Sequence, residues 1–148
     1  MNCNFTFCIL NFKLNCVAIL GIDFGLKHIG VAISYNNVLA EPLTQIKYKE
    51  KNELIKKLAK LVEKYQIKKI ILGISESKMA KETKAFGKKL SKKTNIPVVY
   101  QDETLSSVEA SQRMVEAGLR QKKRQIKIHQ AAAALILQNF LDERKKTC

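Results

Sequence analysis

The stretch ILGIDFGLKHIGVAIS, at residues 19–34, decides the fold of this chain. Residues 17–22 form a continuously apolar run that stops at Asp23, which is the pattern of a central strand buried on both faces. After Gly25 and a short basic turn, residues 29–35 predict a second strand. The two strands are expected to pair as antiparallel neighbours, with the Asp23 carboxylate at the end of the first.

The rest of the chain changes its hydrophobic period in a regular order. An Asn36-Asn37 turn introduces a third strand, and apolar residues then recur at helical spacing, beginning with Leu54 and Leu58. A basic loop at 119–127 is expected to precede the last helix. The predicted strands are 17–22, 29–35, 38–46, 69–74 and 98–101, and the predicted helices are about 54–65, 81–93, 106–117 and 128–144.

This order predicts an α/β fold. Three antiparallel strands followed by alternating helices and strands imply one mixed five-stranded sheet flanked by helices, because parallel neighbours need crossover connections. Ligands on such sheets bind at the carboxyl ends of the strands, where Asp23 is expected. We therefore expect a single domain at 17–148, preceded by an N-terminal arm at 1–16 to which no role is assigned.

Charge and composition narrow the function classes. With 27 Lys or Arg against 13 Asp or Glu, the 148 residues carry a formal charge of +14. A field of this sign attracts polyanions, so nucleic acid is the leading partner class. The alternative is that the lysines only solvate helix faces. Hydrophobic residues make up 46% of the chain, which is enough for a core and argues against disorder.

The expected environment is the cytoplasm. No window approaches the roughly 20 apolar residues of a membrane span, so we expect a soluble protein with no membrane partner. Residues 1–16 lack the basic start and the cleavage site of a signal peptide. The sequence leaves open a monomer or a homodimer. Cysteines without metal-site spacing, expected to be reduced thiols, are Cys3, Cys8, Cys16 and Cys148.

Carboxylates at two strand ends are the first candidates for chemistry. Asp23 follows the first strand, and Asp102 with Glu103 follows the strand at 98–101. If both strands end on one sheet edge, these carboxylates converge, and a divalent ion such as Mg²⁺ relieves their repulsion. The structural alternatives are an Asp23 side chain that caps the turn at Gly25, and an Asp102 or Glu103 that caps the following helix.

A histidine and a basic run lie near the last helix. His129 is expected to open that helix; a lone histidine there is more often a core or capping group than a ligand, although neutral imidazole can bind a divalent metal. The basic residues before it are expected to contact phosphates, unless they form a solvated loop. Lys27, with His28 beside it, is a weaker candidate. The candidate nucleic-acid-binding residues are Lys27, Arg120, Lys122, Lys123, Arg124 and Lys127.

Four strings, in this order and spacing, resemble the YqgF/RuvX family. They are ILGIDFGLKHIGVAIS at 19–34, KIILGI at 69–74, DETLSSVEA at 102–110 and AAAALILQNFLD at 131–142. The resemblance covers about residues 18–142. It implies a ribonuclease H-like fold, similarity to Holliday junction resolvases of the RuvC type, and an assignment as a nuclease of pre-16S ribosomal RNA.

The same resemblance implies roles for individual residues. Asp23 and Glu103 match the family's metal-binding catalytic carboxylates, where Mg²⁺ or Mn²⁺ activates water for attack on a phosphodiester. The family's third acidic position falls on His129 in this chain. Related resolvase-type sites can use histidine as the third ligand, so the departure bears on metal affinity and pH dependence.

The sequence therefore predicts a metal-dependent nuclease that processes the 5′ end of pre-16S ribosomal RNA, with Asp23, Glu103 and His129 at its catalytic metal site. One alternative keeps the fold and acts on branched DNA as a Holliday junction resolvase. Another is a catalytically silent RNA-binding factor of ribosome assembly, which the histidine at 129 favours. A phosphate loop of the actin-like kinase type is disfavoured, because those enzymes need two such domains.

Overall fold

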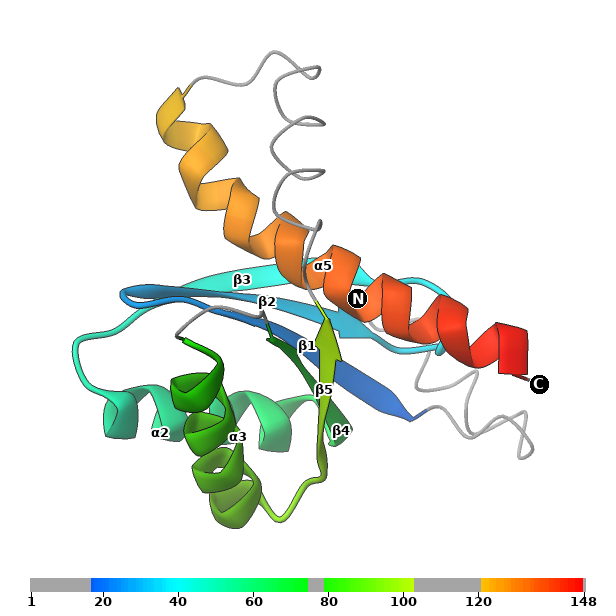
Figure 1. Cartoon of the computed structure of the whole chain (residues 1–148), viewed down its shortest axis with the longest axis horizontal. Helices are drawn as coiled ribbons and strands as arrows, with labels where there is room; N and C mark the ends of the chain where they lie inside the picture. Colours follow the sequence, from blue (N-terminus) through cyan, green and yellow to red (C-terminus); the bar gives the residue numbers. More distant parts are fainter. Residues whose placement is uncertain (1–16, 75–78, 103–120, 148) are drawn as a thin grey trace.

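The computed structural model describes residues 17–74, 79–102 and 121–147, which form one sheet with helices on both faces (Figure 1). The expected arm at 1–16 and the expected helix at 106–117 lie outside these ranges. Within them, no helix is long and apolar enough to cross a membrane. The strands are β1 Ala18–Phe24, β2 His28–Ser34, β3 Glu41–Lys47, β4 Ile67–Ile74 and β5 Val98–Asp102, and the helices are α2 Lys51–Lys64, α3 Ala80–Thr94 and α5 Gln121–Thr147.

The sheet has the order β3-β2-β1-β4-β5. β1 pairs with β2, and β2 with β3, in antiparallel register, whereas the pairs β1 with β4 and β4 with β5 are parallel. The predicted mixed five-stranded sheet is therefore confirmed. Because β1, β4 and β5 run in the same direction, their carboxyl ends lie on one edge of the sheet.

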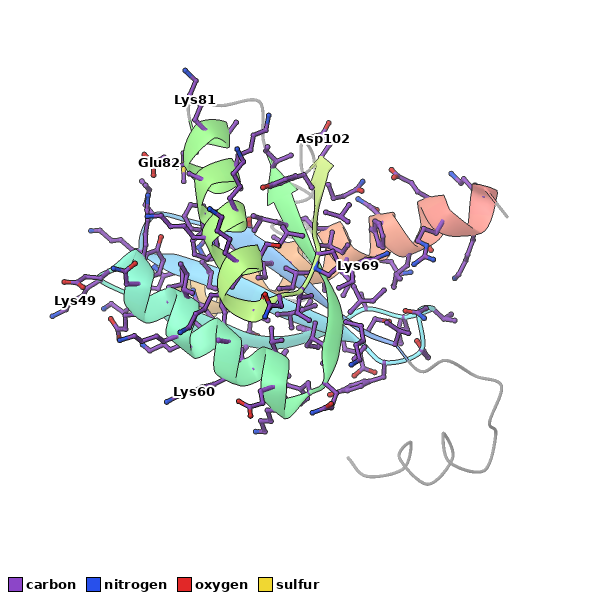
Figure 2. All side chains as sticks on the ribbon, turned by 90° about the horizontal axis from the view of Figure 1, so that it is seen from below. Lys49, Lys60, Lys69, Lys81, Glu82 and Asp102 are labelled. Carbon is purple, nitrogen blue, oxygen red and sulfur yellow. The ribbon has the colours of Figure 1, made fainter. Side chains whose placement is uncertain are left out.

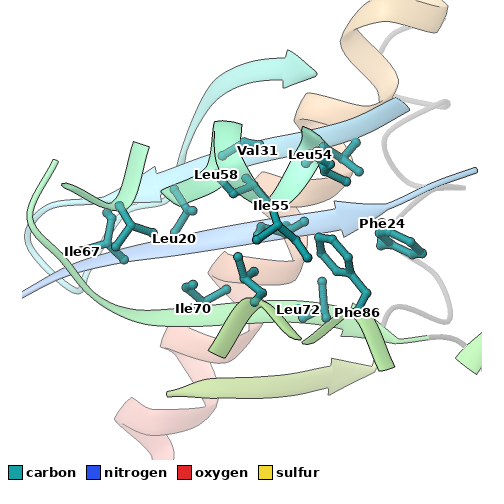
Figure 3. Close-up of a cluster of buried hydrophobic side chains, with 14 of the residues drawn as sticks. Leu20, Phe24, Val31, Leu54, Ile55, Leu58, Ile67, Ile70, Leu72 and Phe86 are labelled. Carbon is teal, nitrogen blue, oxygen red and sulfur yellow. The ribbon is translucent and has the colours of Figure 1, made fainter. Parts of the chain in front are cut away.

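Strand pleating separates two cores. On β1, Leu20 and Ile22 belong to the core under α2 and α3, whereas Ile19 belongs to the core under α5. Helices α2 and α3 lie on one face of the sheet and α5 on the other (Figures 1 and 2). The α2–α3 core is the larger, and its residues labelled in Figure 3 are Leu20, Phe24, Val31, Leu54, Ile55, Leu58, Ile67, Ile70, Leu72 and Phe86.

Helix α5 packs close to its face because two strand positions have no side chain. A Cβ atom on Gly21 would lie 2.7 Å from Cβ of Leu137, and one on Gly30 would lie 1.7 Å from the carbonyl oxygen of His129. Glycine at Gly30 allows a backbone approach that any other residue would block. The position of His129 over the sheet therefore depends on Gly30.

Helix α5 begins earlier than the sequence pattern predicts. It starts at Gln121, so the expected loop at 119–127 is wrong from that residue on, and so is the expected helix start near 128. Residues 121–127 contain no glycine or proline, and Lys, Arg and Gln are good helix formers, so the helix continues through them. His129 consequently lies inside the helix and does not open it.

Strand β3 begins later than expected, at Glu41 instead of 38. The Asn36 side chain extends the turn, since its Oδ1 accepts hydrogen bonds from the backbone N–H groups of Val38 and Leu39, both at 3.0 Å. Asn37 adopts a φ of 59°, which asparagine tolerates better than most residues. These contacts keep the chain in a loop until Glu41.

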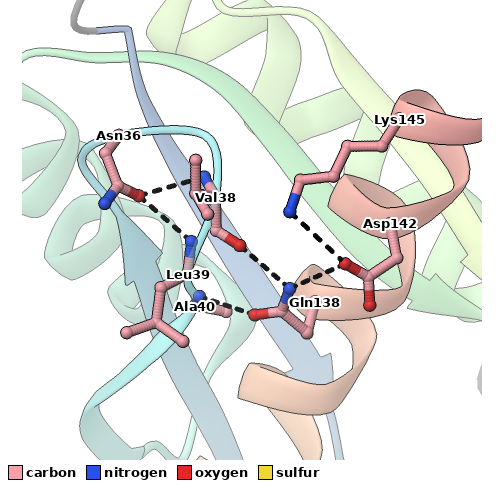
Figure 4. A network of polar contacts seen from close by, with 7 residues as sticks. All are labelled: Asn36, Val38, Leu39, Ala40, Gln138, Asp142 and Lys145. Carbon is pink, nitrogen blue, oxygen red and sulfur yellow. Dashed lines mark hydrogen bonds and ion pairs between the residues drawn. The ribbon is translucent and has the colours of Figure 1, made fainter. Parts of the chain in front are cut away.

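Gln138 of α5 binds this loop to the helix (Figure 4). Its Oε1 accepts a hydrogen bond from the N–H of Ala40 at 2.9 Å, and its Nε2 donates to the carbonyl of Val38 at 3.0 Å. The same Nε2 donates to Oδ1 of Asp142, which in turn lies 3.8 Å from Lys145. The network holds the carboxyl-terminal half of α5 against the loop between β2 and β3.

Candidate active site

The carboxyl ends of three strands meet at one edge of the sheet. β1 pairs with β4 as far as Ile22, and β4 pairs with β5 as far as Asp102. The expectation that the strands leading to Asp23 and to Asp102 end on the same edge is therefore confirmed. Glu103 lies outside the described residues, so its place beside Asp23 stays a prediction.

The two faces of β5 differ at this edge. The Gln101 side chain donates a hydrogen bond to a glutamate of α5, whereas the Tyr100 hydroxyl donates to a backbone carbonyl of α3. Alternation along the strand therefore assigns Asp102 to the α3 face, away from Asp23.

Asp23 is a buried carboxylate with an imidazole beside it. Its residue is 7% exposed, and its parity on β1 puts it on the α5 face. Oδ2 of Asp23 lies 3.4 Å from Nδ1 of His129. A buried carboxylate needs a hydrogen-bond donor or a cation, and His129 supplies one partner. Among the described residues, the Asp23 side chain makes no bond to the turn at Gly25, so turn capping does not explain it.

Both histidines of the chain lie near the end of β1 that carries Asp23. His28 opens β2, and its ring lies nearly parallel to that of His129, with 6.2 Å between centroids and 19° between planes. From the sequence, His28 is only a weak candidate for a phosphate contact. Strand register is the signal that could have predicted the place of His28. Gly30 lies directly opposite Asp23, and His28, two residues earlier on β2, is on the same face of the sheet as Gly30.

The turn that follows Asp23 is anchored from the α2–α3 side. Phe24 stacks between Phe86, at 4.7 Å, and Tyr48, at 6.4 Å between ring centroids. The Tyr48 hydroxyl donates a hydrogen bond to the carbonyl of Gly25, and its backbone N–H donates to the carbonyl of Lys27 at 3.1 Å. Burial raises the pKa of Tyr48, which keeps this donor protonated. The strand end is thus held rigidly beside the helix that carries His129.

The described candidates for phosphate binding lie in the turn between β1 and β2 and on the first turns of α5. Lys27 is exposed in the turn between β1 and β2. Four more candidates lie on the first turns of α5, before His129, and these turns extend past the sheet (Figure 1). They are Lys122, Lys123, Arg124 and Lys127, whose side chains lie outside the described part of the structure, as does the whole of Arg120.

Asp23 changes the proton affinity of His129. The hydrogen bond that His129 donates to Asp23 raises the pKa of His129 above its ordinary value, burial partly opposes this, and the negative charge of Asp23 adds to the rise. The imidazole therefore holds a proton at a higher pH than an exposed histidine does. A protonated Nδ1 donates to Oδ2 of Asp23 and forms a charged pair with it.

We expect this pair to stabilise the fold more at low pH than at high pH. Because the folded-state pKa of His129 is raised from 6.5, its contribution is complete below that value and is lost as the pH rises through the folded pKa. The measurement is the difference in free energy of unfolding between the wild type and His129→Gln, without divalent metal, from about pH 5 to about pH 9. A difference that grows toward high pH would contradict the pairing.

Sequence comparison now adds to this geometry. A family model described as RuvX, Holliday junction resolvase, matches residues 17–143. The chain belongs to the RuvX family. A relative from Lactococcus lactis subsp. cremoris is 38% identical over 133 residues, which cover 84% of this chain and 93% of the relative. One from Lactobacillus acidophilus is 39% identical over 139 residues, which cover 86% and 98%. Both relatives are provisionally named as pre-16S rRNA nucleases.

Solved structures share the RuvX fold. RuvC of T. thermophilus, in complex with a Holliday junction substrate, has a TM-score of 0.57 at 15% identity, covering 88% of this chain and 97% of RuvC. The Fowlpox virus resolvase, in complex with Holliday junction DNA, has a TM-score of 0.56 at 16% identity, covering 86% and 99%. At these identities the likeness is one of fold, and it confirms the expected RuvC-like, ribonuclease H-like architecture.

RuvX membership supports the enzyme class that the resemblance implied, a phosphodiester-cleaving hydrolase with nucleic acid as its partner class. RuvC-like nucleases generally use divalent metal ions. Asp23 and His129 fit such an ion in part, since they offer an oxygen and a nitrogen donor 3.4 Å apart. No group of three His, Cys, Asp or Glu side chains suited to a metal occurs within 17–74, 79–102 and the described side chains of α5.

Proposed function

We propose that this RuvX-family protein is a divalent-metal-dependent nuclease that processes the 5′ end of pre-16S ribosomal RNA in the cytoplasm. The observation that carries the proposal is the buried Asp23 carboxylate at the shared strand edge, 3.4 Å from an imidazole of α5. A buried acid beside an imidazole with a perturbed pKa, at the edge where such sheets bind ligands, supports a functional site at this position.

Asp23, Glu103 and His129 are the proposed metal ligands. Neighbouring ligand atoms around an octahedral ion with bonds of about 2.1 Å lie about 3 Å apart, so the separation between Asp23 and His129 needs little adjustment. Glu103 is proposed as the third ligand because it directly follows β5, whose carboxyl end lies on the same edge of the sheet as Asp23. Carboxylates suit Mg²⁺ and Mn²⁺, and an imidazole shifts the preference toward Mn²⁺.

The chain's own groups perform the remaining work. A bound ion would supply an activated water and would stabilise the leaving oxygen. Asp23 holds its carboxylate in one orientation, because β1 and the anchored turn fix its backbone on both sides. His129 binds an ion only as a neutral imidazole, so the pKa that Asp23 raises makes ion binding compete with protonation of the ring. Lys27 and the basic residues on the first turns of α5 are the proposed phosphate contacts.

The proposed substrate rests on the relatives, which are provisionally named as pre-16S rRNA nucleases. The experiment compares cleavage of a pre-16S ribosomal RNA fragment and of a four-way DNA junction by the purified protein, in Mg²⁺ and in Mn²⁺. We expect the RNA precursor to be cut at least about tenfold faster, as judged by kcat/KM. Preferential cutting of the junction would instead assign the protein to the resolvases of branched DNA.

A silent assembly factor is the second candidate function, because His129 stands where the family pattern has an acid. The same experiment separates it from the nuclease. Salt-sensitive RNA binding without cleavage in either metal would support the silent factor and would contradict the proposed nuclease.

A further inference from the structure

Much of the positive charge lies on the face of the sheet opposite Asp23. Helix α3 carries six lysines and one glutamate, and α2 carries five lysines and two glutamates. The two helices therefore hold eight of the fourteen excess positive charges of the chain. Both pack on the face that α5 leaves free (Figures 1 and 2).

Helix α3 differs from α2 in having no acid among its lysines after Glu82. Its single acid, Glu82, pairs with Lys51 of α2 at 3.2 Å. No acid occurs from 83 to 101, and none of the α3 lysines forms an ion pair within the described residues. On α2, by contrast, Lys57 pairs with Glu53 at 2.8 Å. The exposed lysines of α3 are Lys81, Lys84, Lys88, Lys89, Lys92 and Lys93.

The α3 lysines form a ridge along the helix. Lys84, Lys88 and Lys92 are spaced four residues apart and so lie on one stripe, and Lys81 continues it toward the helix start. Like charges at this spacing destabilise a helix by about 0.2–0.5 kcal/mol per pair. The helix dipole favours cations only in the last turn, so it accounts for Lys92 but not for Lys81 or Lys84. A bound polyanion would offset this repulsion.

The ridge starts near the candidate active site. Helix α3 begins after β4 reaches the edge shared by the carboxyl ends of the strands, and Lys81 and Asp102 lie toward the same end of the molecule (Figure 2). From there the ridge runs over the opposite face for the length of the helix, which is about 22 Å at 1.5 Å per residue. A strand that passes the edge can therefore continue along α3.

We propose that the lysine ridge of α3 is a second nucleic-acid-binding surface, which holds the phosphate backbone of a strand on the face of the sheet opposite Asp23. The ligand chemistry is a row of phosphates, because the ridge offers ammonium groups at regular spacing with no acid between Lys84 and Lys92. This surface is separate from the proposed cleavage reaction, because it contributes to nucleic-acid binding and contains none of the residues proposed to cleave.

The test replaces three lysines on each of two helices with the same spacing. The ridge variant is Lys84→Gln with Lys88→Gln and Lys92→Gln. The matched control on α2 is Lys56→Gln with Lys60→Gln and Lys64→Gln, which removes the same charge at the same spacing; Lys60 projects away from α3 (Figure 2). Lys and Gln have similar helix propensities, so both variants should stay folded, as thermal unfolding will check.

Binding is measured without divalent metal, so its outcome does not depend on cleavage. The probes are an RNA hairpin and a DNA duplex of equal length, with polyglutamate as an acidic competitor. Removing three phosphate contacts should lower the slope of log K against log salt by about 2 to 3 and weaken binding at least tenfold at about 0.1 M salt. A larger effect on the hairpin or on the duplex tells which nucleic acid the ridge holds.

The control variant should change the slope by less than half as much. Equal losses in both variants would overturn the proposal, because net charge alone would then explain binding. Unchanged nucleic-acid binding by the ridge variant together with weaker polyglutamate binding would also overturn it and would assign the ridge to an acidic protein. A retained nuclease activity on a short oligonucleotide, with binding of the long probes lost, is the pattern that the proposal expects.

Discussion

Asp23→Asn should abolish metal-dependent cleavage while leaving RNA binding nearly intact. The substitution keeps the size of the side chain and removes the charge that would hold the ion, so the several kcal/mol supplied by metal catalysis are lost. Because each 1.36 kcal/mol is tenfold in rate, we expect a fall of at least roughly a thousandfold. Phosphate contacts dominate affinity, so binding should change by no more than about twofold.

The measurement is single-turnover cleavage in Mg²⁺ and Mn²⁺, beside RNA binding in their absence. Asp142→Asn is the matched control, because Asp142 is an exposed carboxylate of α5 that contacts Gln138 and Lys145, far along the helix from His129. The control should keep its activity. Full activity of Asp23→Asn, or a parallel loss of RNA binding, would contradict the role given to this carboxylate.

Gly30→Ala should destabilise the fold by at least about 3 kcal/mol, at the upper end of overpacking effects. The added Cβ would lie 1.7 Å from the carbonyl oxygen of His129, and this atom belongs to the helix backbone, which cannot rotate away as a side chain does. Helix α5 must therefore shift, and His129 moves away from Asp23. We expect cleavage to fall together with stability.

Urea unfolding measures the change, with Gly87→Ala as the matched control. A Cβ on Gly87 would meet the Tyr100 hydroxyl at 2.6 Å, and that hydroxyl ends a side chain that can move. Alanine is also a better helix former than glycine by about 1 kcal/mol, so the control should stay within about 1 kcal/mol of the wild type. If Gly30→Ala were as stable as the wild type, α5 could not lie where the structure places it.

The sequence predicted secondary structure correctly where a single hydrophobic period extends through the whole segment. The apolar run before Asp23 predicted a strand buried on both faces, and β1 is buried along its whole length. The helical stripe of Leu54 and Leu58 likewise predicted α2, whose buried side chains include both. These patterns depend on local spacing, which was enough to predict a mixed five-stranded sheet with Asp23 at the end of its first strand, whereas the strand order β3-β2-β1-β4-β5 comes from the structure.

Features that depend on how α5 packs on the sheet could not be predicted from the spacing of residues along the sequence. The basic segment before His129 looked like a loop because of its charge, whereas its good helix formers extend α5 back to Gln121. The approach of His28 to His129 requires both the β1–β2 register and the position of α5. The same holds for Gly30, whose fit against the helix is visible only once both elements are placed.

The proposed nuclease mechanism depends on a divalent ion at the Asp23 carboxylate. A crystal of the wild-type protein soaked in Mn²⁺ and measured for anomalous scattering tests this most directly. The account predicts an anomalous peak about 2.2 Å from an oxygen of Asp23, with Glu103 and His129 also within bonding distance. A protein that cleaves RNA in Mn²⁺ but shows no peak at Asp23, or shows its peak elsewhere, would contradict it.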